Sequence, residues 1–229
     1  MPTFASAATL EQDMLESSAM NPGHPGPDGY HRTLPGARDP HALFEQTLKA
    51  WNGHDDVWVF GYASLIWRPE FESTEQRRAT VYGWHRALEM RSRVNRGTPE
   101  CPGLVFALVR GGCCHGMVYR MPATDARGQL ERLWAREMPT GVYDPRWLQC
   151  RTPDGTVRAL TFTLSHKSPS HTGPLPEAQM VDILRRANGR YGTTLAYLVE
   201  TARCLKACGI RDRDVERLVA LARRHALTS

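Results

Sequence analysis

The chain has 229 residues, which suits one domain of ordinary size with a tail, or two small domains. Hydrophobic residues make up 41% of it, enough for a buried core, yet no apolar run approaches the roughly 18 residues of a membrane span. The net charge is +5, and its arginines are scattered, whereas nucleic-acid-binding proteins usually show a basic stripe. We therefore expect no membrane or nucleic-acid partner, and a mild attraction for anionic small molecules.

Residues 1–55 are predicted to form an N-terminal extension to a folded domain of residues 56–229. Residues 20–40 are rich in Pro and Gly and predict irregular structure. A short helix is predicted over residues 41–52 and ends at Gly53. Residues 1–8 lack the basic start and apolar segment of a secretory signal, which predicts a cytoplasmic protein.

From residue 56 the sequence is rich in β-forming residues. Residues 57–60 predict a buried strand that ends at Gly61, and residues 79–91 predict two strands broken at Gly83. Two hairpins are expected. The first joins residues 104–110 and 113–121 through Gly111-Gly112, and the second joins residues 147–151 and 157–164 through Pro153-Asp154-Gly155.

Helices are expected between and after these strands, over residues 124–138, 176–187, 193–208 and 212–225. Thr124 is the predicted N-cap of the first, and Arg223, Arg224 and His225 suit the negative end of the last. Hairpins with interspersed helices predict an α+β domain, with a small barrel as its plausible core.

The helix over residues 124–138 has an acid on its apolar face. Leu130, Leu133 and Trp134 follow the spacing i, i+3 and i+4, and Glu137 takes the next position of the stripe. Arg132 and Arg136 are predicted to lie on the opposite, solvated face. An unpaired buried carboxylate costs several kcal/mol. Two interpretations remain open, an ion pair with an arginine or a general acid–base whose pKa is raised by burial.

The segment Gly61-Tyr62-Ala63-Ser64-Leu65 directly follows the first buried strand. Small residues there let backbone N–H groups approach an anionic ligand, although an ordinary tight turn is the more common outcome of this pattern. Ser64 lacks the G-x-S-x-G context of hydrolase nucleophiles and is a poor nucleophile candidate.

The six cysteines form no C-x-x-C pair, so a zinc framework is not predicted. Cys204 and Cys208 are expected to be small apolar fillers on a helix. A hydrolase built on Cys113, Cys114 and His115 is a weak alternative, because neighbours in a strand point to opposite faces.

Several segments together resemble the ChaC family of γ-glutamylcyclotransferases. They are, in chain order, residues 60–69 (FGYASLIWRP), Gly83-Trp84-His85-Arg86, Arg96-Gly97-Thr98, Pro102-Gly103, residues 133–138 (LWAREM) with Gly141 and Tyr143, Gly192-Thr193-Thr194, and Tyr197-Leu198. The resemblance runs from about residue 56 to 221 and is bacterial in type. Ala63 stands where the family usually has glycine, and Thr194 where asparagine is common.

The resemblance implies a compact β-barrel with peripheral helices, so that residues 56–229 would be a γ-glutamylcyclotransferase-like catalytic domain. It also implies cleavage of glutathione into 5-oxoproline and Cys-Gly, without metal or cofactor, by a monomer or weak dimer. The catalytic residue would be Glu137. The substrate-binding residues would be Gly61, Tyr62, Ala63, Ser64, Leu65, Ile66, Tyr143 and Tyr197.

Two alternatives to this activity remain. One is a cyclotransferase for other γ-glutamyl amino acids or amines, and the other is a regulatory module that binds without turnover. The methyl group of Ala63 would matter for substrate binding if that position required a positive φ.

Overall fold

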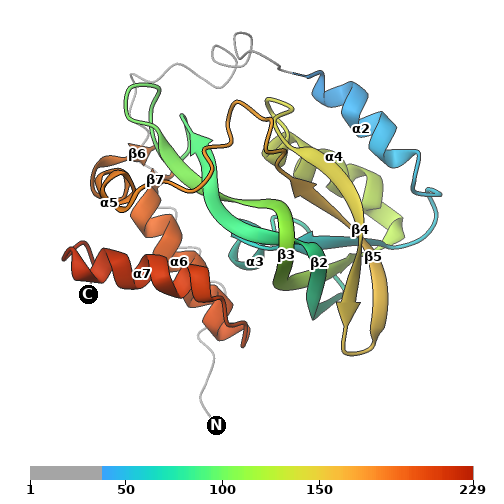
Figure 1. Cartoon of the computed structure of the whole chain (residues 1–229). Helices are drawn as coiled ribbons and strands as arrows, with labels where there is room; N and C mark the ends of the chain where they lie inside the picture. The colour runs from blue at the N-terminus through green and yellow to red at the C-terminus, as the bar shows by residue number, and fades with distance from the viewer. Residues whose placement is uncertain (1–37, 229) are drawn as a thin grey trace, which may run out of the picture. The chain divides into compact units, whose positions relative to one another are not determined.

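Five β-strands form a closed barrel in residues 38–228, the part of the chain that this computed structural model describes (Figure 1). The strands are β1 (Val57–Gly61), β2 (Glu75–Ser92), β3 (Gly103–Met121), β4 (Asp144–Thr152) and β5 (Gly155–Thr163). Their order is β1-β3-β2-β4-β5, and a parallel pairing of β1 with β5, at Trp58 and Ala159, closes the barrel. The predicted irregular segment 20–40 lies outside the described residues except for its end at 38–40.

The β2–β3 pair is the largest part of the barrel, and here one sequence prediction is wrong. β2 and β3 pair antiparallel from Glu75–Arg120 to Ser92–Gly103, so the connection is the loop of residues 93–102 and not Gly111-Gly112. Those two glycines lie in β3 opposite Gly83 of β2, where the register shifts. All three have positive φ, between +66° and +108°. Glycine adopts such angles freely, and here they form a bulge within two continuous strands.

The second predicted hairpin is confirmed. β4 and β5 pair antiparallel from Asp144–Thr163 to Thr152–Gly155, and Pro153 and Asp154 form the turn. The hydroxyl of Thr152 donates to the Gly155 carbonyl at 2.8 Å and accepts from the Asp154 amide at 3.2 Å. The side chain therefore satisfies backbone groups that the tight turn leaves unpaired.

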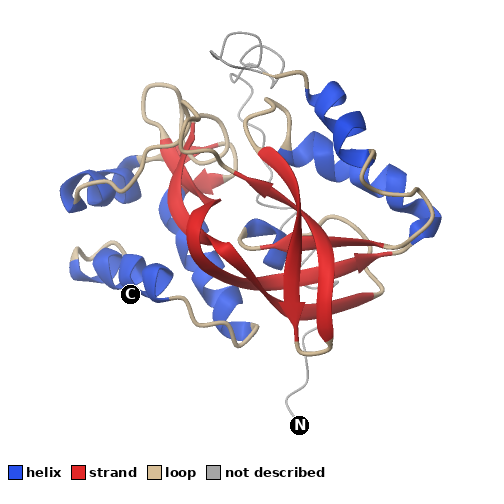
Figure 2. Ribbon diagram, turned by 45° about the vertical axis from the view of Figure 1, so that its right-hand side comes forward, coloured by secondary structure: helices blue, strands red, loops and turns tan. Residues whose placement is uncertain are grey.

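Six α-helices in residues 38–228 surround the barrel. They are α2 (Pro40–Leu48), α3 (Ser64–Trp67), α4 (Ala126–Glu137), α5 (Glu177–Arg186), α6 (Thr194–Ala207) and α7 (Arg213–Arg224). A short hairpin of β6 (Asn188–Gly189) and β7 (Gly192–Thr193) precedes α6. Helices α2 and α4 lie on one side of the barrel and α5, α6 and α7 on the other (Figure 2). The α+β class is confirmed.

Capping residues explain where the C-terminal helices begin. Thr193 accepts a hydrogen bond from the Ala196 amide, and Asp212 accepts from the amides of Asp214 and Val215. The predicted cap at Thr124 is wrong. Thr124 lies in a 3₁₀ turn, Ala123–Asp125, and Asp125 takes the N-cap position of α4 without a side-chain cap hydrogen bond.

The buried side chains form two hydrophobic clusters, and β1 contributes to both. Phe60 belongs to the first cluster, with residues of α5, α6 and α7, whereas Val59 belongs to the second, with residues of α2 and α4. Adjacent residues of a strand point to opposite faces, so one strand can serve two cores. Phe44 of α2 packs edge-on against Trp134 of α4, at 5.2 Å between ring centroids.

The predicted boundary between an N-terminal extension of residues 1–55 and a domain of residues 56–229 stays a prediction.

Candidate active site

Glu137 is the last residue of α4, and the helix brings it to the second hydrophobic cluster. Leu130, Leu133 and Trp134 are buried as their spacing predicted, and the side chain of Glu137 is only 15% exposed. The negative end of a helix disfavours a carboxylate. The acid therefore occupies a position that opposes its ionisation through burial as well as through the helix dipole.

Arg136 is placed differently from the prediction. Arg132 is exposed as expected, but the Arg136 side chain is only 20% exposed. Its Nε lies 3.1 Å from Oε1 of Glu137, and its Nη1 lies 3.0 Å from Oε2 of Glu70. It also donates to the Ser64 hydroxyl at 3.2 Å and to the Arg68 carbonyl. Arg136 thus links the acid to the segment after β1, and both interpretations of Glu137, ion pair and shifted acid, apply together.

Burial raises the pKa of the Glu137 carboxyl above its ordinary value. The Arg136 guanidinium opposes this shift, and the charge of Glu70 adds to it. The net direction is upward because burial is the largest of the three effects. A carboxyl of this kind can accept a proton near neutral pH and return it more readily than an exposed glutamate.

The segment from Gly61 to Ile66 connects β1 to the short helix α3. A Cβ at Gly61 would lie 3.0 Å from Cβ of Leu65 and 3.2 Å from the ring of Tyr119, so the chain turns tightly there. Within residues 38–228, the amide groups of Ala63, Ser64 and Leu65 donate no hydrogen bond, whereas the Ile66 amide donates to the Ala63 carbonyl at 2.9 Å. Unpaired amides in a turn can receive an anionic group.

Ala63 does not require glycine-like geometry. Its φ is −145°, an angle that any L-residue adopts, and its side chain is buried in the first hydrophobic cluster. The methyl group therefore introduces no positive-φ strain into the segment.

Arg86 of β2 fixes this segment from the opposite side. Its side chain is fully buried, and its guanidinium donates to the carbonyl of Tyr62 and to the carbonyl of His115, the latter at 2.6 Å. The same group pairs with Asp212, the N-cap of α7. Arg86 thus ties the turn after β1 to β3 and to the C-terminal helix.

Three buried tyrosines lie within electrostatic range of the acid. Burial raises the pKa of the Tyr62, Tyr143 and Tyr197 hydroxyls, and the charge of Glu137 acts on all three in the same direction. Tyr62 donates to the Phe162 carbonyl at 3.0 Å, and the Tyr197 hydroxyl accepts from the Phe106 amide at 3.3 Å. Tyr62 and Tyr197 belong to the first hydrophobic cluster and Tyr143 to the second. The candidate site therefore lies where the two clusters meet.

Residues 57–225 match the family model described as ChaC-like protein. The chain belongs to the ChaC-like family. The predicted family membership is confirmed, and the match covers the barrel and all helices from α3 to α7.

Curated relatives and one solved structure agree with this membership. A glutathione-specific γ-glutamylcyclotransferase of Escherichia coli (strain K12) is 36% identical over 179 residues, which cover 78% of each chain. Glutathione-specific γ-glutamylcyclotransferase 1 of Homo sapiens is 31% identical over 170 residues, covering 72% of this chain and 76% of the human one. A crystal structure of the yeast γ-glutamylcyclotransferase specific to glutathione superposes with a TM-score of 0.68 at 19% identity, over 75% of this chain and 97% of the yeast one. The predicted γ-glutamylcyclotransferase-like fold is confirmed.

Cys113, Cys114 and His115 do not form a reactive group in this ChaC-like chain. Burial raises the pKa of the Cys114 thiol to about 11, which disfavours the reactive thiolate, and Cys113 is exposed on the other face of β3. His115 hydrogen-bonds Thr80 through Nδ1 at 2.9 Å. These contacts give no support to the Cys-His alternative.

Two general properties concern the described part of the chain. Its helices are all too short or too polar to span a bilayer. Between residues 38 and 228, no three His, Cys, Asp or Glu side chains are grouped so that they could hold a metal ion.

Sequence reasoning assigned no role to two groups near the site. Arg86 and Trp67 stand within family-like motifs, but only the folded chain shows that Arg86 is fully buried. The indole Nε1 of Trp67 is also buried, and it has no hydrogen-bond partner in residues 38–228. A long polar side chain between apolar strand residues was the available signal for Arg86.

Proposed function

We propose that this ChaC-like protein cleaves the γ-glutamyl bond of glutathione by internal cyclisation, releasing 5-oxoproline and Cys-Gly. The observation that carries the proposal is Glu137, a nearly buried carboxyl whose pKa is raised by burial. Its charge acts on three buried tyrosines, Tyr62, Tyr143 and Tyr197. The names of the curated relatives from Escherichia coli and Homo sapiens support the substrate.

The reaction joins two groups that glutathione already contains. The α-amine of its γ-glutamyl unit attacks the γ-carbonyl carbon and closes a five-membered ring, while the amide bond to cysteine breaks. Holding amine and carbonyl together lowers the barrier because the nucleophile needs no encounter. Two proton movements remain, since the amine must lose a proton and the departing nitrogen must gain one.

We assign both proton movements to Glu137. As a carboxylate it takes the proton from the attacking amine, and as a carboxylic acid it returns that proton to the nitrogen of Cys-Gly. The pKa of this group is raised by burial, which suits a residue that alternates between the two forms. Arg136, at 3.1 Å, keeps the carboxylate form accessible.

The segment from Gly61 to Ile66 is the proposed binding site of the γ-glutamyl group. The amides of Ala63, Ser64 and Leu65 would receive its α-carboxylate or the negative charge that develops on the carbonyl oxygen. Tyr143 and Tyr197 would bound the group on the side of the barrel, with their apolar rings excluding water.

The scheme consumes no water, metal, nucleotide or other cofactor. We propose a cytoplasmic protein that works as a monomer or weak dimer. The six cysteines are all free in the structure, which suits a reducing compartment.

The decisive experiment measures 5-oxoproline released from glutathione by the wild type and by Glu137→Gln. We expect a fall of about 100-fold or more, the scale for losing a general acid–base. Glu131→Gln is the matched control, because Glu131 lies on the same helix with its side chain 54% exposed. N-acetylglutathione, which has no free α-amine, should give no product.

Near wild-type turnover by Glu137→Gln would refute the acid–base assignment. A wild type that releases no 5-oxoproline from glutathione but does so from γ-Glu-Ala would favour the broader cyclotransferase. Binding of glutathione without release of product from either compound would favour the regulatory module.

A further inference from the structure

Arg96 is a half-buried cation that has no acidic partner in residues 38–228. It lies in the loop of residues 93–102 between β2 and β3, and its guanidinium carbon is 5.1 Å from the ring centroid of Tyr197. Its Nη1 donates to the Tyr191 carbonyl. No carboxylate in residues 38–228 lies within ion-pair distance of it. Burial lowers the pKa of Arg96, and the charge of Arg68 acts in the same direction. Arg68 itself pairs with Glu70, so Arg96 is the member of this pair of cations that lacks a carboxylate among the described residues.

The backbone around Arg96 is held with little freedom. Arg96 N–H donates to the Ser92 hydroxyl at 2.9 Å, and its carbonyl accepts from the Thr194 hydroxyl at 3.2 Å. A Cβ at Gly97 would lie 2.1 Å from the Gly103 amide, and one at Gly189 would lie 2.6 Å from the Val94 carbonyl. Such close approach requires glycine at both positions, so the cation is positioned before any ligand arrives.

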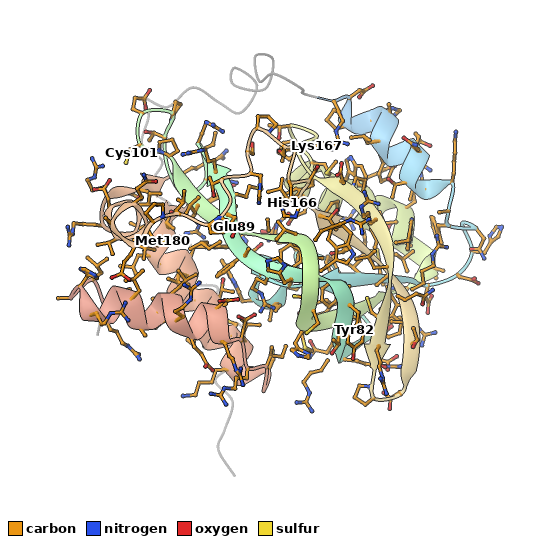
Figure 3. All side chains as sticks on the ribbon, in the orientation of Figure 1. Tyr82, Glu89, Cys101, His166, Lys167 and Met180 are labelled. Atoms are coloured by element: carbon orange, nitrogen blue, oxygen red, sulfur yellow. The ribbon has the colours of Figure 1, made fainter. Side chains whose placement is uncertain are left out.

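The loop lies on the α5–α6 side of the barrel. Figure 3 labels Cys101 in this loop and Met180 in α5 on that side. The half-exposed Tyr191 is in contact with three arginines there, Arg68, Arg96 and Arg190, through its ring or its carbonyl. This positively charged group therefore reaches the surface, unlike Glu137.

Tyr197 is the residue on which the charges of both this cation and the acid act. Its hydroxyl responds to the charges of both Glu137 and Arg96, with opposite signs, whereas neither of the two charges affects the pKa of the other. An extended tripeptide reaches roughly 10 Å. The proposal requires a substrate whose amine contacts Glu137 to place its far end beside Arg96, 5.1 Å from the Tyr197 ring.

A second unsatisfied donor borders the same ring. Trp67 packs edge-on against Tyr197 at 6.3 Å, and its buried Nε1 has no acceptor within residues 38–228. A buried donor without an acceptor destabilises the free protein. An unpaired cation and an unpaired donor around one ring together indicate a ligand that supplies acceptor oxygens.

We propose that Arg96 binds the glycine carboxylate of glutathione and so selects the tripeptide over γ-glutamyl compounds that lack this group. The inference rests on the proposed function and extends it to the leaving half of the substrate. The Trp67 indole donates to a peptide carbonyl, whereas Arg68 is already paired with Glu70. The forked guanidinium matches a carboxylate in a way that a lysine does not.

The test compares glutathione with its glycine monoethyl ester, in which only the far carboxylate is neutralised. We expect the wild type to prefer glutathione by about 10- to 100-fold in kcat/KM, the range for losing a charge-assisted hydrogen bond. Arg96→Met should lose this preference by becoming slow on glutathione while its rate on the ester stays near that of the wild type. Arg96→Lys should regain part of the preference.

Arg190→Met is the matched control. Arg190 is exposed and lies over the Tyr191 ring at 5.4 Å, so its removal should leave the preference intact. An equal fall on both substrates in Arg96→Met would overturn the proposal, as would a wild type that turns over both equally. The wild-type comparison decides even where the Arg96 variant fails to fold.

A binding measurement separates this proposal from the proposed function. Calorimetry with Glu137→Gln should show tighter binding of glutathione than of the ester, and Arg96→Met in that background should abolish the difference. A wild type without 5-oxoproline release would refute the proposed function. The ratio of the two dissociation constants from calorimetry would still decide whether Arg96 binds the carboxylate. Equal affinities for glutathione and the ester would overturn the proposed role of Arg96.

Discussion

At the scale of single residues, the carboxyl of Glu137 should make the fold sensitive to pH. Burial raises its pKa in the folded protein, so the folded state holds the proton more tightly than the unfolded state does. The stabilisation that follows is fully present below the ordinary glutamate pKa and is lost as the pH rises through the raised value. Glu137→Gln, which stays neutral, should therefore gain free energy of unfolding relative to the wild type between pH 4 and pH 8.

Urea denaturation at both pH values measures this gain. Glu131→Gln should show no comparable change, because the Glu131 side chain is 54% exposed to solvent. If Glu137→Gln were relatively less stable at pH 8 than at pH 4, the Arg136 ion pair would outweigh burial, and the assigned direction of the pKa shift would be wrong.

Some residues of the candidate site could be predicted from the sequence and others could not. The burial of Glu137 was predictable, because helix periodicity gives the direction in which a side chain leaves the helix axis. The same periodicity misplaced Arg136, since it does not give the path of a long, flexible side chain. The guanidinium of Arg136 turns back to Glu137, Glu70 and the Arg68 carbonyl, a path that depends on segments distant in the sequence.

At the scale of elements, the predicted hairpin failed for a definite reason. A Gly-Gly pair between apolar runs is typical of a two-residue turn, and positive φ is what such a turn requires. A bulge in a long strand requires the same angles, as Gly111 and Gly112 show. Local sequence cannot distinguish a turn from a bulge, because the outcome depends on the partner strand. Here that strand is β2, which pairs with β3 on both sides of the two glycines. The β4–β5 turn was predictable because Pro153 and Asp154 are unsuited to a strand interior.

The loop between β2 and β3 should be intolerant of added volume. A Cβ at Gly103 would lie 2.0 Å from the Arg96 carbonyl oxygen and 2.4 Å from the Thr194 hydroxyl. Gly103→Ala should therefore cost about 3 kcal/mol of unfolding free energy, at the upper end for overpacking, since backbone must move. Thermal or chemical denaturation measures the cost.

Gly155→Ala provides the comparison, because Gly155 has a φ of +118° but nothing within 4 Å of an added Cβ. It should cost only about 1 kcal/mol, from the unfavourable φ. Equal costs for the two variants would show that the loop can shift, and Arg96 would then not be rigidly held.

At the scale of the whole described unit, Arg86 joins parts that the sequence separates widely. Its guanidinium contacts the turn after β1, the β3 backbone and the N-cap of α7. Arg86→Met should cost about 3–5 kcal/mol, since it leaves the Asp212 carboxylate without its partner. Turnover of glutathione should also fall, because the Tyr62 carbonyl loses its anchor.

A matched variant separates these effects. Asp212→Asn keeps the cap on α7 and the contacts of Arg86 with the Tyr62 and His115 carbonyls. It leaves the fully buried Arg86 guanidinium without its counter-charge, so it should destabilise the fold while turnover falls less than in Arg86→Met. A variant Arg86→Met that unfolds at the wild-type denaturant concentration and keeps full turnover would contradict the role assigned to this residue.

The sequence predicted the fold class of the domain, but it did not predict which strands pair to close the barrel. Alternating strand and helix patterns predicted an α+β domain, and the resemblance implied a barrel. The parallel contact of Trp58 with Ala159 closes that barrel across about a hundred positions of sequence, and no local pattern encodes such a pair.

The bond between Arg86 and Asp212 also has a consequence during protein synthesis. A ribosome adds roughly 5–20 residues per second, so Arg86 is made several seconds before Asp212. At the end of that interval, once Tyr197 has been added, Glu137 and all three tyrosines are in the chain, but Arg86 still lacks Asp212, one of its three hydrogen-bond partners. The nascent protein should consequently stay inactive toward glutathione until its C-terminal helix has left the exit tunnel.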